Sequence, residues 1–262
     1  MVHASLILLL IASACHLSYP FTILPATFTR ISSIRSNKQL LRVGGFDYMP
    51  EEPPPPSATK DSDPARLLTP KLGGTNVYLV GMMGSGKTAV GALLAQRLGP
   101  YTFLDTDNII TSCLPEGTTI EEYFASEGEE SFRSLESQVL NGVHGHVRCV
   151  VSTGGGIVKE RVNWSKMQTG LVCFLDVDLG VISARVGGGE GRPLLQDGDV
   201  MGKLTELMES RRSMYEQADV TIKVDDGEED VEETLLKVVE GLGKFIDENP
   251  PKHQQEPPEV GE

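Results

Sequence analysis

The sequence predicts an α/β protein in which helices cover both faces of a central parallel β-sheet. Short apolar segments alternate with segments whose apolar residues recur at helical spacing. The short segments are mostly apolar throughout, as in strands buried on both faces, and no unit of roughly 20–50 residues repeats. The composition is 39% hydrophobic and 23% charged, which excludes a fibre, a multi-span membrane protein and a fully disordered chain.

The expected elements follow one another in the order of such a fold. Strands are expected at 76–80, 101–104, 149–152, 171–175 and 220–224. Helices are expected at 88–98, 120–125, 132–143, 179–185, 202–217 and 231–246. Ligands of parallel sheets bind at the carboxyl ends of the strands, so the residues that follow each strand are the candidates for chemistry.

Charge and cysteine content exclude several kinds of partner and site. The 262 residues contain 23 Lys and Arg against 37 Asp and Glu, a net charge of −14. This balance argues against a broad surface for nucleic acid or acidic lipid. The 4 cysteines show no paired spacing, so neither a disulfide framework nor a zinc site is expected.

The chain divides into four segments. Residues 1–46 predict a targeting leader, because an apolar run precedes a stretch rich in Ser, Thr and Arg that lacks acidic residues. This order resembles the bipartite signal and transit leaders of plastid proteins in algae; simple secretion and a mitochondrial leader are the alternatives. Residues 47–72 predict a Pro-rich acidic linker, 73–247 the folded domain, and 248–262 a disordered tail.

A phosphate-binding loop follows the first expected strand. The segment matches G-x-x-x-x-G-K-T, and its residues are Gly81, Met82, Met83, Gly84, Ser85, Gly86, Lys87 and Thr88. Its glycines let backbone N–H groups close around phosphate oxygens, Lys87 can reach the β and γ phosphates, and Thr88 can ligate Mg²⁺. The loop predicts a nucleotide and leaves the acceptor open.

Acidic and basic side chains follow at the mouth of the same expected cleft. Asp105 and Asp107 come directly after the second strand, where one carboxylate can hold the Mg²⁺ shell and the other can accept a proton from a hydroxyl. Arg133 is a planar cation suited to a carboxylate ligand. Glu136, one helical turn later, could hold that guanidinium in place, although a surface ion pair is the alternative.

Three further segments carry glycine or arginine. Gly154, Gly155 and Gly156 follow the third strand and permit close approach of a ligand to the backbone. The stretch 185–195 is rich in glycine and contains arginines, as expected of a mobile lid over a nucleotide or of a disordered loop. Residues 211–219 read RRSMYEQAD and lead into the fifth strand.

Taken together, these motifs closely resemble the shikimate kinase family over about 75–246. The resemblance rests on GMMGSGKT, FLDTD, EGEESFRSLE, STGGG, GRPLL and RRSMYEQAD in this order. It implies the three-layer P-loop kinase fold with a mobile lid, Mg²⁺ with ATP as co-substrate, and phosphorylation of the 3-hydroxyl of shikimate. The product is shikimate 3-phosphate, on the route to chorismate and aromatic amino acids.

The resemblance also implies roles for single residues. Lys87 and Arg192 stabilise the transferring phosphate, Thr88 and Asp105 hold Mg²⁺, and Asp107 binds the shikimate hydroxyls and serves as base. Arg133 and Arg211 hold the shikimate carboxylate, with Glu136 supporting Arg133. Gly154, Gly155 and Gly156 line the shikimate pocket, and Arg185 packs on adenine.

Two rival functions share the phosphate loop. One is another small-molecule kinase, such as a gluconate or nucleoside monophosphate kinase; the arginine pair and the three glycines favour shikimate instead. The other is a noncatalytic binding protein on the same fold, which the intact Lys87, Asp105 and Asp107 argue against. We expect a monomer or weak oligomer, and His144 and His146 are interpreted as loop or helix-end residues, not metal ligands.

Overall fold

The structure is a computed structural model, and it describes residues 41–43, 46–48, 63–187, 199–224 and 230–250. Among these residues, none of the helices combines the length and the apolar character that a bilayer span requires.

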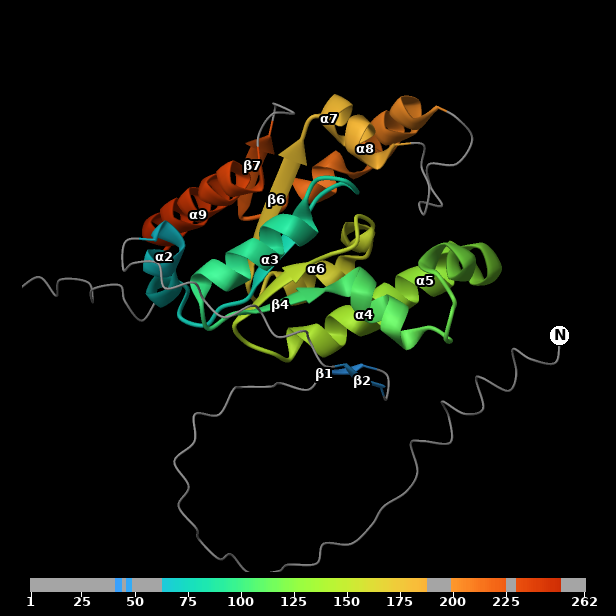
Figure 1. The fold of residues 1–262 in the computed structure, drawn as a ribbon, viewed down its shortest axis with the longest axis horizontal. Coiled ribbons are helices and arrows are strands. Elements are labelled where there is room, and N and C mark those ends of the chain that lie inside the picture. Colours follow the sequence, from blue (N-terminus) through green and yellow to red (C-terminus); the bar gives the residue numbers. More distant parts are fainter. Residues whose placement is uncertain (1–40, 44–45, 49–62, 188–198, 225–229, 251–262) are drawn as a thin grey trace, which may run out of the picture. The chain divides into compact units, whose positions relative to one another are not determined.

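A five-stranded parallel sheet forms the centre of the fold (Figure 1). Its order is β4-β5-β3-β6-β7, and every neighbouring pair is parallel. The strands are β3 (Val77–Val80), β4 (Thr102–Asp105), β5 (Cys149–Ser152), β6 (Leu171–Val177) and β7 (Val220–Val224). All residues of β3 and β5 are buried, which is why these segments read as apolar throughout rather than alternating. The predicted parallel sheet is confirmed.

Helices pack on both faces of this sheet. They are α2 (Pro64–Leu72), α3 (Lys87–Leu98), α4 (Thr106–Cys113), α5 (Ile120–His144), α6 (Arg161–Met167), α7 (Leu179–Val186), α8 (Val200–Tyr215) and α9 (Val231–Glu248), with a 3₁₀ turn, η1 (Ile157–Lys159). Helices α2, α3 and α9 contact one another on one side (Figure 1). Leu79 of β3 faces α3 at Gly91, whereas Phe174 of β6 stacks on Tyr215 of α8 at the opposite face. The predicted three-layer fold is therefore confirmed.

The prediction of a linker up to residue 72 is wrong in its last part, because α2 occupies 64–72. Asp63 caps the helix by accepting from the Ala65 N–H at 3.0 Å, and Pro64 stands at a first-turn position that needs no N–H donor. Its residues Ala65, Leu68 and Leu72 are buried. These apolar residues at helical spacing sit among prolines and charges, which is why composition alone suggested a linker.

Other differences from the prediction are local. Helix α5 joins the two helices expected around residue 128, and Gly128, with φ of 83°, forms a kink between them. The short elements α4, η1 and α6 were not predicted, because each is shorter than the span over which helical periodicity becomes evident.

A separate two-stranded sheet falls where the leader was expected to meet the linker. Strand β1 (Leu41–Val43) pairs antiparallel with β2 (Phe46–Tyr48), with Val43 opposite Phe46. Branched and aromatic residues of this kind favour extended backbone. The remainder of the predicted leader and the predicted tail beyond 250 lie outside the described residues.

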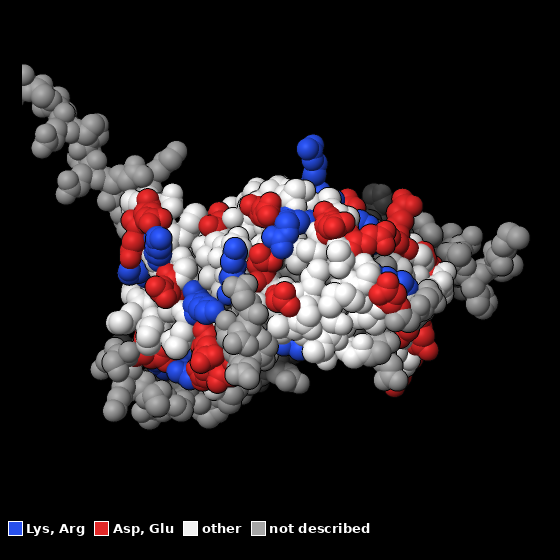
Figure 2. All heavy atoms as spheres, turned by 90° about the horizontal axis from the view of Figure 1, so that it is seen from above, with Lys and Arg blue, Asp and Glu red and all other residues white. Residues whose placement is uncertain are grey.

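Charged side chains of both signs are distributed over the surface. On the face shown in Figure 2, basic side chains are interspersed with acidic ones rather than gathered into one continuous patch. Acidic residues outnumber basic ones in the sequence, and on this face acidic side chains lie among the basic ones.

Candidate active site

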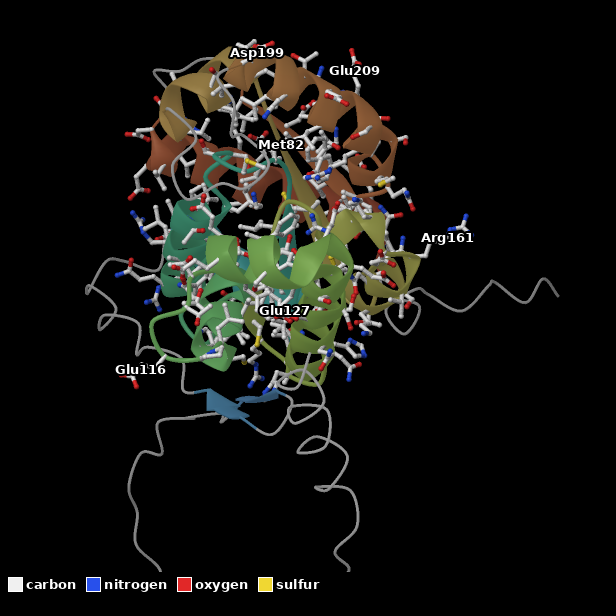
Figure 3. The ribbon with its side chains drawn as sticks, turned by 90° about the vertical axis from the view of Figure 1, so that its right-hand side faces the viewer. Met82, Glu116, Glu127, Arg161, Asp199 and Glu209 are labelled. Atoms are coloured by element: carbon white, nitrogen blue, oxygen red, sulfur yellow. The ribbon has the colours of Figure 1, made fainter. Side chains whose placement is uncertain are left out.

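The phosphate loop runs from the end of β3 to the start of α3, as the motif predicts. Gly81, Gly84 and Gly86 have φ of 145°, 78° and 91°, which side chains with a Cβ rarely adopt. The loop therefore turns tightly and directs the N-terminus of α3, with its partial positive charge, toward the space above it. Figure 3 shows Met82 of this loop well inside the molecule, whereas Glu116, Arg161 and Glu209 point outward.

The ammonium group of Lys87 lies within the loop. It donates to the carbonyl oxygens of Gly81 at 3.0 Å and Met82 at 2.7 Å, and it lies 3.2 Å from Ser85 Oγ. The residue is buried, with 7% of its surface exposed. A cation held at this position is suited to a bound phosphate group.

Thr88 and Asp105 come together at the carboxyl ends of two strands. Thr88 Oγ1 donates to Asp105 Oδ2 at 2.7 Å and lies 3.4 Å from Ser152 Oγ. The other oxygen of Asp105 caps α4 by accepting from the Asp107 and Asn108 N–H groups at 2.9 and 3.3 Å. A hydroxyl and a carboxylate oxygen at this spacing are ligands that Mg²⁺ prefers, so the residues fit the predicted metal.

Asp107 and Glu136 converge on Gly154. A Cβ placed on Gly154 would lie 2.9 Å from Asp107 Oδ1 and 2.5 Å from Glu136 Oε1. Asp107 itself is exposed, in the first turn of α4, whereas Glu136 is 1% exposed. The two carboxylates therefore differ in environment, and Asp107 is the one accessible to a ligand.

The other two glycines face different neighbours. A Cβ on Gly155 would lie 3.3 Å from the Met83 amide nitrogen and 3.4 Å from the Gly81 oxygen, so this residue packs on the phosphate loop. A Cβ on Gly156 would overlap the guanidinium of Arg133. Each glycine therefore permits one close contact, and the segment joins the phosphate loop to the arginine.

Two carboxylates hold Arg133. Its Nη1 donates to Glu136 Oε2 at 2.5 Å, while Nε and Nη2 donate to Glu129 Oε1 at 3.3 and 3.2 Å. Lys159 of η1 also binds Glu129 Oε1, at 2.6 Å. Glu136 supports Arg133 as predicted; Glu129 and Lys159 are additions that the sequence analysis missed, since their link spans 30 residues.

Burial and charge pairing act in opposite directions on the pKa values of Glu136 and Arg133. Burial raises the pKa of the Glu136 carboxyl and the charge of Asp107 adds to the rise, whereas Arg133 and Arg211 oppose it. Burial alone would lower the pKa of Arg133, but Glu136 and Glu129 hold it above its ordinary value. Arg133 therefore stays charged, which a binding site for an anion requires.

Arg211 reaches the same place from α8. It is 4% exposed, and its Nη1 donates to the Gly155 carbonyl at 3.1 Å. The Tyr215 hydroxyl, one turn along the helix, donates to the same oxygen at 2.6 Å. A helix was predicted for the RRSMYEQAD segment, but nothing in its sequence indicated this hydrogen bond from Tyr215.

The remaining predicted residues lie toward the nucleotide side. A Cβ on Gly86 would lie 3.9 Å from Arg185 Nη1, so the exposed Arg185 at the end of α7 lies beside the phosphate loop. Arg192 and the predicted lid lie outside the described residues. His144 ends α5, as predicted, and the described part of the chain contains no cluster of three or more metal-ligating side chains.

The phosphate loop thus adjoins a cluster formed by two buried arginines, an exposed carboxylate and a glycine backbone. This fold and site define the class of P-loop small-molecule kinases. The family model described as shikimate kinase matches residues 83–242. This chain belongs to the shikimate kinase family.

Relatives and solved structures of this family cover the same region. A shikimate kinase of the cyanobacterium Trichormus variabilis is 48% identical over 175 residues, which cover 67% of this chain and 94% of the relative. One from Thermosynechococcus vestitus is 47% identical over 174 residues, covering 66% and 93%. The solved shikimate kinase from Acinetobacter baumannii in complex with shikimate has a TM-score of 0.61 at 33% identity. It covers 72% of this chain and 99% of that one.

Proposed function

We propose that this chain transfers the terminal phosphoryl group of ATP to the 3-hydroxyl of shikimate, giving shikimate 3-phosphate and ADP. The chain is an ATP-dependent kinase of the shikimate kinase family. The observation that carries the proposal is the convergence of the phosphate loop, Asp107, Arg133 and Arg211 on the segment 154–156. The rival of a nucleotide-binding protein without catalysis does not explain why an exposed carboxylate and two buried arginines meet there.

The acceptor side fits a small anion that carries hydroxyl groups. Arg133 and Arg211 supply rigid donors for a carboxylate, and their burial strengthens each charged hydrogen bond. Asp107 lies next to Gly154, where it can accept a proton from the attacking hydroxyl. The glycines allow the ring of the acceptor to lie against the backbone.

The nucleotide side supplies charge stabilisation. Lys87 and the loop N–H groups would bind the phosphates. Arg185, which lies beside Gly86, would pack on adenine, and Arg192 would reach the transferring phosphoryl group. Thr88 and Asp105 would hold Mg²⁺, which would supply positive charge to offset the negative charge that develops during transfer. In this reaction class, catalysis depends mainly on positioning and electrostatics.

The test is an ADP-release assay on the full chain with shikimate, gluconate and nucleoside monophosphates offered in parallel. Release that depends on shikimate alone is the expected result. Equal or greater release with gluconate or a nucleoside monophosphate would assign the acceptor differently. No release with any acceptor, from protein that still binds ADP, would favour the noncatalytic alternative.

We further propose that the leader directs the protein to plastids. The cyanobacterial origin of the similar kinases supports this, because plastids descend from cyanobacteria. The test is a fluorescent reporter fused to residues 1–62, which leaves α2 out. Fluorescence in plastids is expected; fluorescence confined to the secretory lumen, mitochondria or cytosol would contradict the proposal.

A further inference from the structure

The hydroxyl of Tyr215 contacts both the phosphate loop, residues 81–88, and the glycine segment 154–156. It donates to the Gly155 carbonyl at 2.6 Å and lies 3.7 Å from Met82 Sδ in the phosphate loop. The side chain is fully buried, and its ring stacks on Phe174 of β6 with centroids 4.9 Å apart and planes 13° apart. The ring is thus fixed by the sheet, and the hydroxyl points at both loops.

Gly155 is held between α8 and the phosphate loop. Its carbonyl accepts from Arg211 at 3.1 Å as well as from Tyr215. A Cβ placed on Gly155 would meet the Met83 amide nitrogen and the Gly81 oxygen, at 3.3 and 3.4 Å. The hydrogen bonds from Tyr215 and Arg211 therefore fix the Gly155 carbonyl at a point where Gly155 also packs on the phosphate loop.

We propose that Tyr215 is a positioning residue for phosphoryl transfer. Its hydroxyl fixes Gly155 against the phosphate loop and so sets the distance between the terminal phosphoryl group and the acceptor hydroxyl. The inference rests on the proposed function and deepens it. In-line transfer is sensitive to such placement, since a shift of about 1 Å can cost roughly 10²-fold in rate.

The protonation of Tyr215 suits this role. A carbonyl oxygen only accepts hydrogen bonds, so the tyrosine must keep its proton. Burial raises the pKa of Tyr215, although Arg211 opposes the rise, and the hydroxyl remains a donor at neutral pH.

The chain provides a matched control in Tyr78. Both tyrosines are fully buried, and the polar neighbours of the Tyr78 hydroxyl, Asn76 and Cys149, lie outside both the phosphate loop and the segment 154–156. Tyr215→Phe and Tyr78→Phe each delete one oxygen and keep the ring. Only Tyr215→Phe removes a hydrogen bond to the glycine segment 154–156.

The experiment measures kcat and KM for ATP and shikimate in the parent and both variants, together with ADP binding by calorimetry. Rates are expressed per ADP-binding site, so that any loss of folded protein is corrected. For Tyr215→Phe we expect kcat to fall about tenfold, because Arg211 still holds Gly155, while ADP affinity stays within about twofold. For Tyr78→Phe we expect every value within about twofold of the parent.

Three results would overturn the proposal. The first is an unchanged kcat in Tyr215→Phe, and the second is an equal fall of kcat in both variants. The third is loss of ADP binding in Tyr215→Phe, which would mean that the hydroxyl stabilises the fold instead. A parent without shikimate-dependent turnover would contradict the proposed function and this inference together. An active parent with an unchanged Tyr215→Phe contradicts this inference alone.

Discussion

Adding one methyl group at Gly156 should disable the acceptor site while sparing the nucleotide site. In Gly156→Ala the new Cβ overlaps the Arg133 guanidinium, which must move by roughly 1 Å. That movement breaks the 2.5 Å bond to Glu136. The displaced guanidinium would also lose the proposed hydrogen bond to the shikimate carboxylate. Hydrogen bonds between charged groups contribute about 1.5–3 kcal/mol, so we expect the KM for shikimate to rise about 10- to 150-fold.

Steady-state kinetics with each substrate varied in turn measures this effect. The KM for ATP should stay within about twofold, because among the described residues the hydrogen bonds of Arg133 go to Glu129 and Glu136, outside the phosphate loop. Gly145→Ala is the matched control, since the nearest atom to its added Cβ is the Gly142 oxygen at 3.7 Å and its φ is −71°. An unchanged KM for shikimate in Gly156→Ala, or equal rises for both substrates, would refute the reasoning.

Three further predictions follow from the same contacts. Asp107→Asn should keep ADP affinity within about twofold in calorimetry but lower kcat by about 10² or more, since an amide accepts no proton; near-normal turnover would remove Asp107 from the role of base. Leu68→Ala should lower the free energy of unfolding by about 2–4 kcal/mol in urea titrations, whereas Leu67→Ala, at a residue 60% exposed, should have little effect; equal losses would mean that α2 does not pack as described. Burial raises the pKa of Cys149 and Cys173 to about 12, so at pH 8 only about 10⁻⁴ of each is thiolate, and mass spectrometry after alkylation of the native protein should find both unmodified; rapid labelling of either would contradict their burial.

The sequence by itself determined the parallel sheet, the phosphate loop and the kind of acceptor. Lys87 and Thr88 were found because their geometry depends on eight consecutive residues, and β5 and β7 were placed correctly because strand burial leaves a continuous or alternating apolar pattern. The six motifs also predicted the family to which the chain belongs. Such features are local, so neighbouring residues are enough to specify them.

Only the tertiary structure decided how the separate stretches meet. Tyr215 lies 60 residues from Gly155 and 133 from Met82, and no local pattern announces a hydrogen bond between residues that far apart. The same holds for the ion pair between Lys159 and Glu129. It also holds for α2, whose sequence resembles a linker although its buried leucines pack in a helix beside α3 and α9. The physical reason is that a side chain's contacts depend on the packing of the whole sheet and its helices, whereas its sequence neighbours specify only its own helix, strand or turn.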